Sequence, residues 1–158
     1  TRMFTHTGPR RGDVFMESTF AKQIALIEKG YQDPIVRVGN LASMRTIADV
    51  RDAVKAYWKL VTTSPEPGAY YNIGGKKSLK VGEILKDLIN LSTTKTIKFK
   101  TDKERLRPID ADLQIPNVNK FVKKTGWSPS ISYENTLEDL LNYWRKRVEK
   151  EGNTFLER

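Results

Sequence analysis

Segments with the apolar spacing of helices alternate along this chain with short β-branched or aromatic runs. Apolar residues that recur every three or four positions predict amphipathic helices, and short apolar runs bounded by glycine, proline or polar residues predict strands. The predicted helices cover 17–29, 48–61, 78–91, 117–126 and 132–150. The predicted strands cover 1–6, 35–38, 69–75 and 95–100. Strands interleaved with helices in this way predict an α/β protein.

Two of these helices carry signals for their ends and their buried sides. The helix over 48–61 has Asp49 and Asp52 in its first turn, where the helix dipole favours acidic residues. Its predicted buried side consists of Val50, Val54, Tyr57, Trp58 and Val61. Ser78 is predicted to be the N-cap of the following helix. The predicted inward side of that helix consists of Val81, Ile84, Leu85, Leu88 and Leu91.

Length and composition narrow the class of protein. A chain of 158 residues corresponds to one domain or to a large piece of one. The absence of cysteine excludes disulfides, a thiolate nucleophile and a cysteine-based zinc site, and it fits a reducing compartment. No apolar stretch approaches the length of a membrane span, and the first residues lack the order of a signal peptide. We therefore expect a soluble, cytoplasmic protein.

The net charge of +9, from 28 basic and 19 acidic residues, points to an anionic partner. Many lysines fall on predicted helix surfaces, where a solvated face is the simpler explanation. The arginines are better candidates because most lie in or beside loops, where the planar guanidinium can clamp a phosphate. They are Arg2, Arg10, Arg11, Arg37, Arg45, Arg51, Arg105 and Arg107. A nucleic-acid-binding domain is an alternative based on charge alone, but no motif for it is present.

Recognisable catalytic sets are missing. No glycine-rich phosphate loop follows a predicted strand, and His6 is the only histidine, so a multi-histidine metal site is excluded. No tyrosine has a lysine four positions later, so a helical tyrosine–lysine acid–base pair is also absent. The sequence therefore predicts no catalytic residue and no metal ligand within these 158 residues.

A turn in "THTGPRRG" (5–12) is the first candidate for ligand binding. It presents Arg10 and Arg11 directly after a Gly-Pro pair, so two guanidinium groups and backbone amides can face one phosphate. A solvated basic turn is the alternative. Arg45 precedes the predicted second helix, whose N-terminal dipole would favour an anion there. Arg107 could instead form a structural ion pair with a nearby acidic residue.

Five segments in order resemble the C-terminal half of the extended short-chain dehydrogenase/reductases, and most of all the GDP-mannose 4,6-dehydratases and related reductases. These segments are "FTHTGPRRG" (4–12), "VGNLASMRTIADVRDAVKAYW" (38–58), "GAYYNIGG" (68–75), "RLRPIDADL" (105–113) and "KKTGWSPSISYENTLEDLLNYWR" (123–145). The resemblance implies a Rossmann-type fold of which residues 1–158 are the sugar-nucleotide-binding portion, with the last sheet strands and the smaller mixed α/β domain. The dinucleotide-binding half would be absent.

The resemblance also implies an activity. In that family a nucleotide-sugar is oxidised at C4 by bound NADP, or by NAD in some members, and loses water across C5 and C6 before the hydride returns to C6. The catalytic tyrosine and lysine lie in the other half, which accounts for the missing chemistry here. The implied ligand is GDP-mannose, and the complete protein would be a homo-oligomer. A reductase of GDP-4-keto-6-deoxymannose, a nucleotide-sugar 4-epimerase and a non-catalytic nucleotide-sugar-binding module remain alternatives.

Site residues follow from the resemblance position by position. His6 and Arg11 would contact the cofactor. The residues implied in binding the nucleotide-sugar are Thr5, Lys22, Gly39, Asn40, Arg45, Arg107 and Asp110. Thr5 stands where the family usually has asparagine, and Thr46-Ile47 stands where it has aspartate and an aromatic residue. The basic pair in the turn favours a dehydratase, because the reductases often carry a less basic turn.

The same comparison assigns a set of large apolar residues near the C-terminus to the core between the last helices rather than to stacking on a ligand. They are Trp127, Leu140, Leu141, Tyr143 and Trp144.

Overall fold

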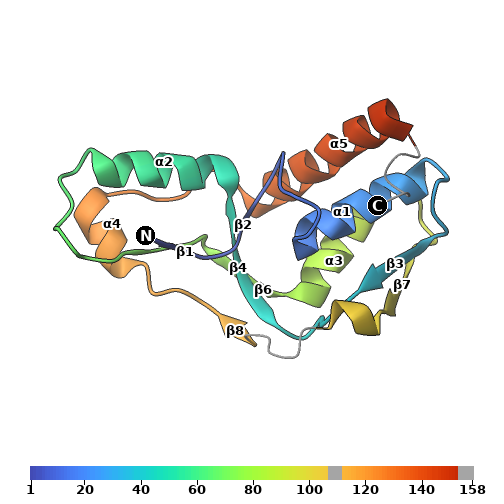
Figure 1. Ribbon diagram of the computed structural model, residues 1–158, viewed down its shortest axis with the longest axis horizontal. Helices are drawn as coiled ribbons and strands as arrows, with labels where there is room; N and C mark the ends of the chain where they lie inside the picture. The colour runs from blue at the N-terminus through green and yellow to red at the C-terminus, as the bar shows by residue number, and fades with distance from the viewer. Residues whose placement is uncertain (107–111, 153–158) are drawn as a thin grey trace.

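The computed structural model describes residues 1–106 and 112–152 and has two lobes joined by a small central sheet (Figure 1). The larger lobe contains helices α1 (Met16–Glu28), α3 (Val81–Asn90) and α5 (Tyr133–Glu151). These helices share one hydrophobic core with strand β3 (Ile35–Val38), which pairs in parallel with β7 (Lys98–Thr101). Ile24, Leu88, Leu140 and Trp144 are among its fully buried residues.

The smaller lobe contains helices α2 (Val50–Val61) and α4 (Asn119–Thr125) beside a two-stranded parallel sheet. Its strands are β1 (Arg2–Met3) and β5 (Asn72–Ile73). A separate core of aromatic and aliphatic side chains holds this lobe together. It consists of Ala56, Leu60, Tyr71, Ile73, Phe121 and Trp127.

Strand β4 (Met44–Asp49) is the centre of the sheet between the lobes. It pairs in parallel with β2 (His6–Thr7) and β8 (Leu113–Gln114), and antiparallel with β6 (Lys77–Lys80). A short 3-10 helix, η1 (Lys103–Arg105), follows β7. The long β4 strand thus carries the chain from one lobe to the other (Figure 1).

The α/β prediction is confirmed, but several element boundaries differ from the predicted ones. Strand β4 was not predicted, and helix α2 begins only at Val50, with Asp49 as its N-cap accepting a hydrogen bond from the Arg51 amide. Ser78 lies in the unpredicted strand β6, so its assignment as an N-cap was wrong, and Lys80 holds that position. Both differences arise because β4 and β6 are stabilised by pairing with each other, which local spacing does not reveal.

The predicted buried side of α2 was also wrong. Val54, Trp58 and Val61 are 61%, 71% and 71% exposed. Helix α2 instead buries Asp52 and a stripe of small or aliphatic residues, Ala53, Ala56 and Leu60, against its lobe. An apolar face that remains in solvent on a well-formed helix is a typical sign of a surface that is covered in a larger assembly.

The predicted core between the last helices is confirmed for Leu140, Leu141 and Trp144, whereas Tyr143 is partly buried and packs against that core. Trp127 is buried, but it lies in the separate core of the smaller lobe, so its assignment to this core was wrong. Leu91, predicted to face inward, is the C-cap of α3 and is 39% exposed. None of the described helices is long and apolar enough to cross a membrane.

Candidate functional site

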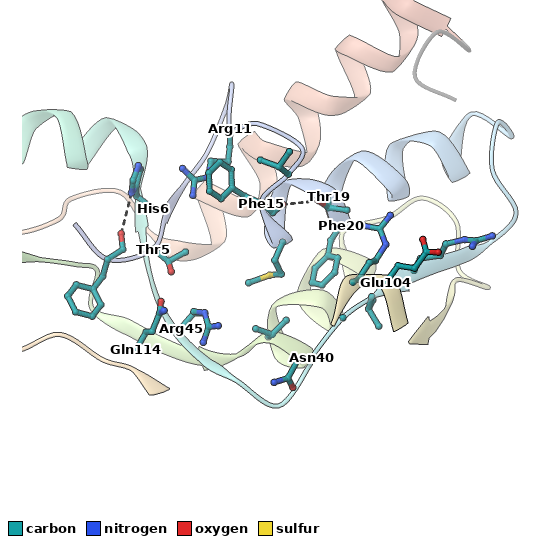
Figure 2. Close-up of a pocket in the computed structure, with 18 of the residues that line it drawn as sticks. Thr5, His6, Arg11, Phe15, Thr19, Phe20, Asn40, Arg45, Glu104 and Gln114 are labelled. Atoms are coloured by element: carbon teal, nitrogen blue, oxygen red, sulfur yellow. Dashed lines mark hydrogen bonds between the residues drawn. The ribbon is translucent and has the colours of Figure 1, made fainter. Parts of the chain in front are cut away.

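A cleft of about 700 Å³ lies where the two lobes meet. Its walls come from the segment after β1, the first turn of α1, the end of β3, strand β4, η1 and β8. Figure 2 shows Arg45 and Gln114 on one side and Phe15 and Phe20, from the start of α1, on the other. The site is therefore assembled from segments that are far apart in the sequence.

The lining of this cleft is strongly basic. Arg11, Arg37, Arg45 and Arg105 line it, and Glu104 is the acidic residue among the described lining residues. Each arginine comes from a different segment, so their convergence is a result of the tertiary fold. A guanidinium group offers paired N–H donors that match phosphate oxygens, and it keeps its charge at all physiological pH values. The cleft is thus suited to an anionic ligand.

The Gly8–Arg11 turn sets the position of Arg11. The Arg11 amide donates to the Gly8 carbonyl over 3.1 Å, with Pro9 at the second turn position. Arg10 at the third position has φ of 72°, the left-handed value that a type II turn requires and that favours glycine. The turn consequently holds a basic side chain in a conformation that costs free energy, a feature that concentrates at functional sites.

Hydrogen bonds from the core of the larger lobe hold the backbone of Arg11 in place. The buried Trp144 indole donates to the Ser18 hydroxyl over 2.9 Å, and that hydroxyl donates to the Arg11 carbonyl over 2.7 Å. The Arg11 guanidinium lies 3.3 Å from the ring centre of Phe15, above which it stacks (Figure 2). Burial lowers the pKa of Arg11, and the nearby Glu17 carboxyl raises it.

A second cavity of about 540 Å³ adjoins the turn on the side of α2. It is lined by His6, Pro9, Arg10, Arg11, Gly12, Val50, Arg51 and Val54. His6 and Arg11 line both cavities. The His6 ring nitrogen Nδ1 lies 3.2 Å from the Phe4 carbonyl, which orients the ring (Figure 2). Two ligands bound side by side would therefore share these two residues.

Several residues implied by the resemblance line the main cleft: Thr5, His6, Arg11, Gly39, Asn40 and Arg45. The Asn40 side-chain nitrogen donates to the Ser43 hydroxyl, and its side-chain oxygen accepts from the Ala42 backbone amide, which shapes the loop before β4. Gly39 is in close contact with the Arg105 carbonyl, and a Cβ there would collide with it. A glycine at this position is what allows η1 to close one side of the cleft.

Arg45 reaches the cleft from a different place than expected. The sequence placed it ahead of a helix N-terminus, whereas it lies inside strand β4, opposite Leu79 of β6. Its Nη1 group donates to the Met44 carbonyl over 2.8 Å. The expected cooperation of Arg45 with a helix dipole was therefore wrong, although its side chain lines the cleft.

Lys22 does not line the cleft. Its ammonium group donates to the Asp13 carboxylate over 2.8 Å and lies 5.9 Å from the ring centre of Trp144 on α5. Arg107 and Asp110 lie outside the described residues. Arg37, Arg105 and Gln114 line the cleft but were not predicted as site residues. The available signal was that most arginines of this chain lie in or beside loops, but only the β3–β7 pairing and the approach of η1 to Gly39 bring Arg37 and Arg105 together.

Comparison with solved structures identifies the class of protein to which this fold belongs. RMD from Pseudomonas aeruginosa, solved as a complex with NADPH, superposes with a TM-score of 0.84 at 28% identity, covering 93% of this chain and 48% of that one. UDP-glucose 4-epimerase from Bifidobacterium longum, in complex with NAD⁺ and UDP, gives a TM-score of 0.75 at 19% identity. The superposition covers 96% of this chain and 47% of the epimerase chain. The fold is that of the C-terminal part of a Rossmann-type extended short-chain dehydrogenase/reductase.

Sequence comparison narrows the class to one family. The family model described as GDP-mannose 4,6 dehydratase matches residues 1–140, and the chain belongs to this family. It is 29% identical over 150 residues to GDP-6-deoxy-D-mannose reductase of P. aeruginosa, covering 95% of this chain and 49% of that protein. It is 27% identical over 156 residues to GDP-mannose 4,6 dehydratase of Dictyostelium discoideum, covering 88% of this chain and 43% of that protein. The chain spans about half the length of these relatives.

Proposed function

We propose that this chain is the sugar-nucleotide-binding half of an NADP-dependent GDP-mannose 4,6-dehydratase. The observation that carries the proposal is the convergence of Arg11, Arg37, Arg45 and Arg105 on one cleft in a chain of this family. The basic pair in the Gly8–Arg11 turn, which resembles the dehydratases, favours dehydration over reduction.

The substrate diphosphate would lie against the arginines of β3, β4 and η1. A diphosphate carries two negative charges, and charge-assisted hydrogen bonds to two or three guanidinium groups would hold it in one orientation. The uncharged amides of Asn40 and Gln114 line the same cleft and can bond to hydroxyl or base groups without adding charge. This arrangement would fix the sugar relative to the His6 and Arg11 wall.

The cofactor would lie on the other side of His6 and Arg11. The second cavity there is bordered by Arg10 and Arg11, whose charges fit a cofactor phosphate, and by His6 as a hydrogen-bonding group. NADP, when bound, supplies the hydride chemistry. The residues of this chain would hold its phosphate and keep the cofactor beside the sugar.

A dinucleotide-binding half would complete the protein. The exposed apolar residues of α2, Val54, Trp58 and Val61, are the surface that such a half would cover, and the relatives are about twice as long as this chain. That half would supply the tyrosine–lysine pair of the resembled family. The complete enzyme would act as a cytoplasmic homo-oligomer.

A reductase of GDP-4-keto-6-deoxymannose is the second candidate. The P. aeruginosa reductase is matched along 95% of this chain, and this similarity favours it. The two reactions differ in their products. Incubation of the complete protein with GDP-mannose and catalytic NADP yields a 4-keto-6-deoxy sugar nucleotide if it is a dehydratase. Consumption of NADPH with the keto sugar, and no turnover of GDP-mannose, would instead identify the reductase.

The substrate site is tested by Arg45→Ala in the protein expressed from its natural reading frame. Loss of a charge-assisted contact to the diphosphate should raise KM for GDP-mannose roughly ten- to hundredfold. Arg147→Ala is the matched control, because Arg147 lies on α5, pairs with Glu151 and does not line the cleft. An unchanged KM for Arg45→Ala would refute the assignment of the cleft to the sugar nucleotide.

A further inference from the structure

A buried acidic residue that the proposed function leaves unused lies directly behind the basic turn. Glu17, in the first turn of α1, is 2% exposed, and its Oε1 atom has no hydrogen-bond partner among residues 1–106 and 112–152. Arg11 Nε is 3.7 Å from Glu17 Oε1, too far for a hydrogen bond, and the part of the chain that the structure describes offers this nitrogen no other hydrogen-bond partner. The two groups attract each other by charge without forming the well-aligned bonds that usually stabilise a buried pair.

The groups around Glu17 have opposing effects on the pKa of its carboxyl, so a change in any of them can change its charge. Burial raises the pKa of Glu17, whereas its own helix amide, Arg11, the Thr7 hydroxyl of β2 and Arg45 of β4 lower it. The Thr7 hydroxyl is itself buried without a well-formed hydrogen bond to any described residue. Two of the groups that favour the charged form of the carboxyl, Arg11 and Arg45, are arginines that line the cleft.

An incoming anion would compete with Glu17 for the same guanidinium. Because Arg11 lines both cavities, a phosphate bound there would bring negative charge close to the Glu17 carboxylate. A like charge disfavours ionisation, and the anion also withdraws the charge that had favoured it. Both effects favour the neutral, protonated form of Glu17.

We propose that Glu17 couples anion binding at Arg11 to the uptake of one proton from solvent. The anion takes the Arg11 guanidinium, the pairing with Glu17 is lost, and the carboxylate becomes a neutral carboxylic acid. Glu17 is then a positioning residue that keeps Arg11 in place while the site is empty and is neutralised when the ligand arrives. The inference rests on the proposed function in taking the natural anion to be the cofactor phosphate.

The sign of the effect follows from this coupling. Anion affinity should fall as pH rises through the titration of Glu17, by up to about tenfold per pH unit for a one-proton linkage. His6 is a second titratable side chain that lines both cavities. Asp49, the residue of β4 paired with Thr7, is held by Arg51 and Thr136. A comparison of variants is therefore needed to separate Glu17 from His6.

Glu17→Gln provides that comparison, because it keeps the size and removes the titration. Sulfate is the first probe, since it does not titrate near neutral pH, and its binding is followed by the NMR signal of the Arg11 side chain. NADPH is the second, followed by fluorescence. With both probes, the affinity of the wild type should depend more steeply on pH than that of Glu17→Gln. The contribution of His6, and of the 2′-phosphate of NADPH, is the same in both proteins and cancels.

Two further variants keep the test decisive. Glu134→Gln is the matched control, because Glu134 also lies in the first turn of a helix but is exposed and away from the cleft. It should keep the pH dependence of the wild type. If Glu17→Gln does not fold, Glu17→Met serves instead, because it also removes the titration and its apolar side chain needs no hydrogen-bond partner at this buried position. It should reduce the pH dependence of sulfate affinity in the same way.

The outcomes separate the inference from the proposed function. Equal pH dependence in wild type and Glu17→Gln, or no sulfate binding at Arg11, would overturn the role of Glu17. NADPH binding or turnover in that case would leave the proposed function standing. A Glu17-dependent sulfate effect without any binding of NADPH would support the proton coupling and refute the proposed cofactor site.

Discussion

Glu28 at the end of α1 connects the helices of the larger lobe. We expect its replacement to lower the free energy of unfolding by an amount that depends on pH. Arg145 of α5 donates to its carboxylate through two nitrogens at 2.7 and 2.8 Å. The Ser92 hydroxyl and the Thr93 amide, just beyond α3, donate to it at 2.8 and 2.9 Å. Its side chain is only 8% exposed.

The hydrogen bonds decide the charge state of Glu28. Burial raises the pKa of its carboxyl, but the bonds from Arg145, Thr93 and Ser92 outweigh this effect and lower the pKa from 4.5 to about 2. A shift of this size corresponds to about 3 kcal/mol in the free energy of unfolding at neutral pH. Because the folded-state pKa is the lower one, this stabilisation is present above about pH 4.5 and is lost as the pH falls towards 2.

Glu28→Gln, measured by urea unfolding against the wild type, should therefore lower the free energy of unfolding by about 3 kcal/mol at pH 7 and by only about 1 kcal/mol near pH 3. Glu149→Gln is the matched control, since Glu149 pairs with Lys29 across the same two helices but both side chains are exposed. Its cost should be below about 1 kcal/mol. A loss for Glu28→Gln that is the same at both pH values would refute the electrostatic reasoning and point to packing alone.

Two further substitutions test backbone geometry, each by urea unfolding. Gly75→Ala should destabilise the protein by about 3 kcal/mol or more, because a Cβ there would collide with the Ile47 carbonyl of β4; a loss below about 1 kcal/mol would show that β4 can move. Arg10→Gly should raise stability by about 0.5 to 1 kcal/mol, because glycine adopts the left-handed φ of this turn without strain, and should weaken NADPH binding; lower stability would mean that Arg10 makes contacts that outweigh the strain.

Prediction from the sequence succeeded where one element carries its own signal. Helices α1, α3 and α5 were located by apolar spacing, and Gly126 at the end of α4 has the left-handed conformation expected of a helix C-cap. Strand β3 was located by its β-branched run. In each case the residues that determine the element are its own neighbours in the chain.

Prediction failed where partners distant in the sequence decide the structure. Strand β4 exists because β2, β6 and β8 pair with it, and each of these strands has only two to four residues. The apolar spacing of α2 identified an apolar side, but the lobe packs against the alanines and Leu60 instead. Periodicity shows that a helix has an apolar face, and it cannot show whether that face lies against this chain or awaits another.

For the candidate site, too, some features could be predicted from the sequence and others only became visible in the tertiary structure. Residue types and order alone determined the α/β class, the helix pattern, the basic turn and the resemblance that pointed to nucleotide-sugar enzymes. Only the tertiary structure showed that Arg37 and Arg105 join Arg11 and Arg45 in one cleft, that Lys22 lies outside it, and that Glu17 is buried behind Arg11. The physical reason is that strand pairing and core packing bring together residues many positions apart, and no local pattern records which of them will meet.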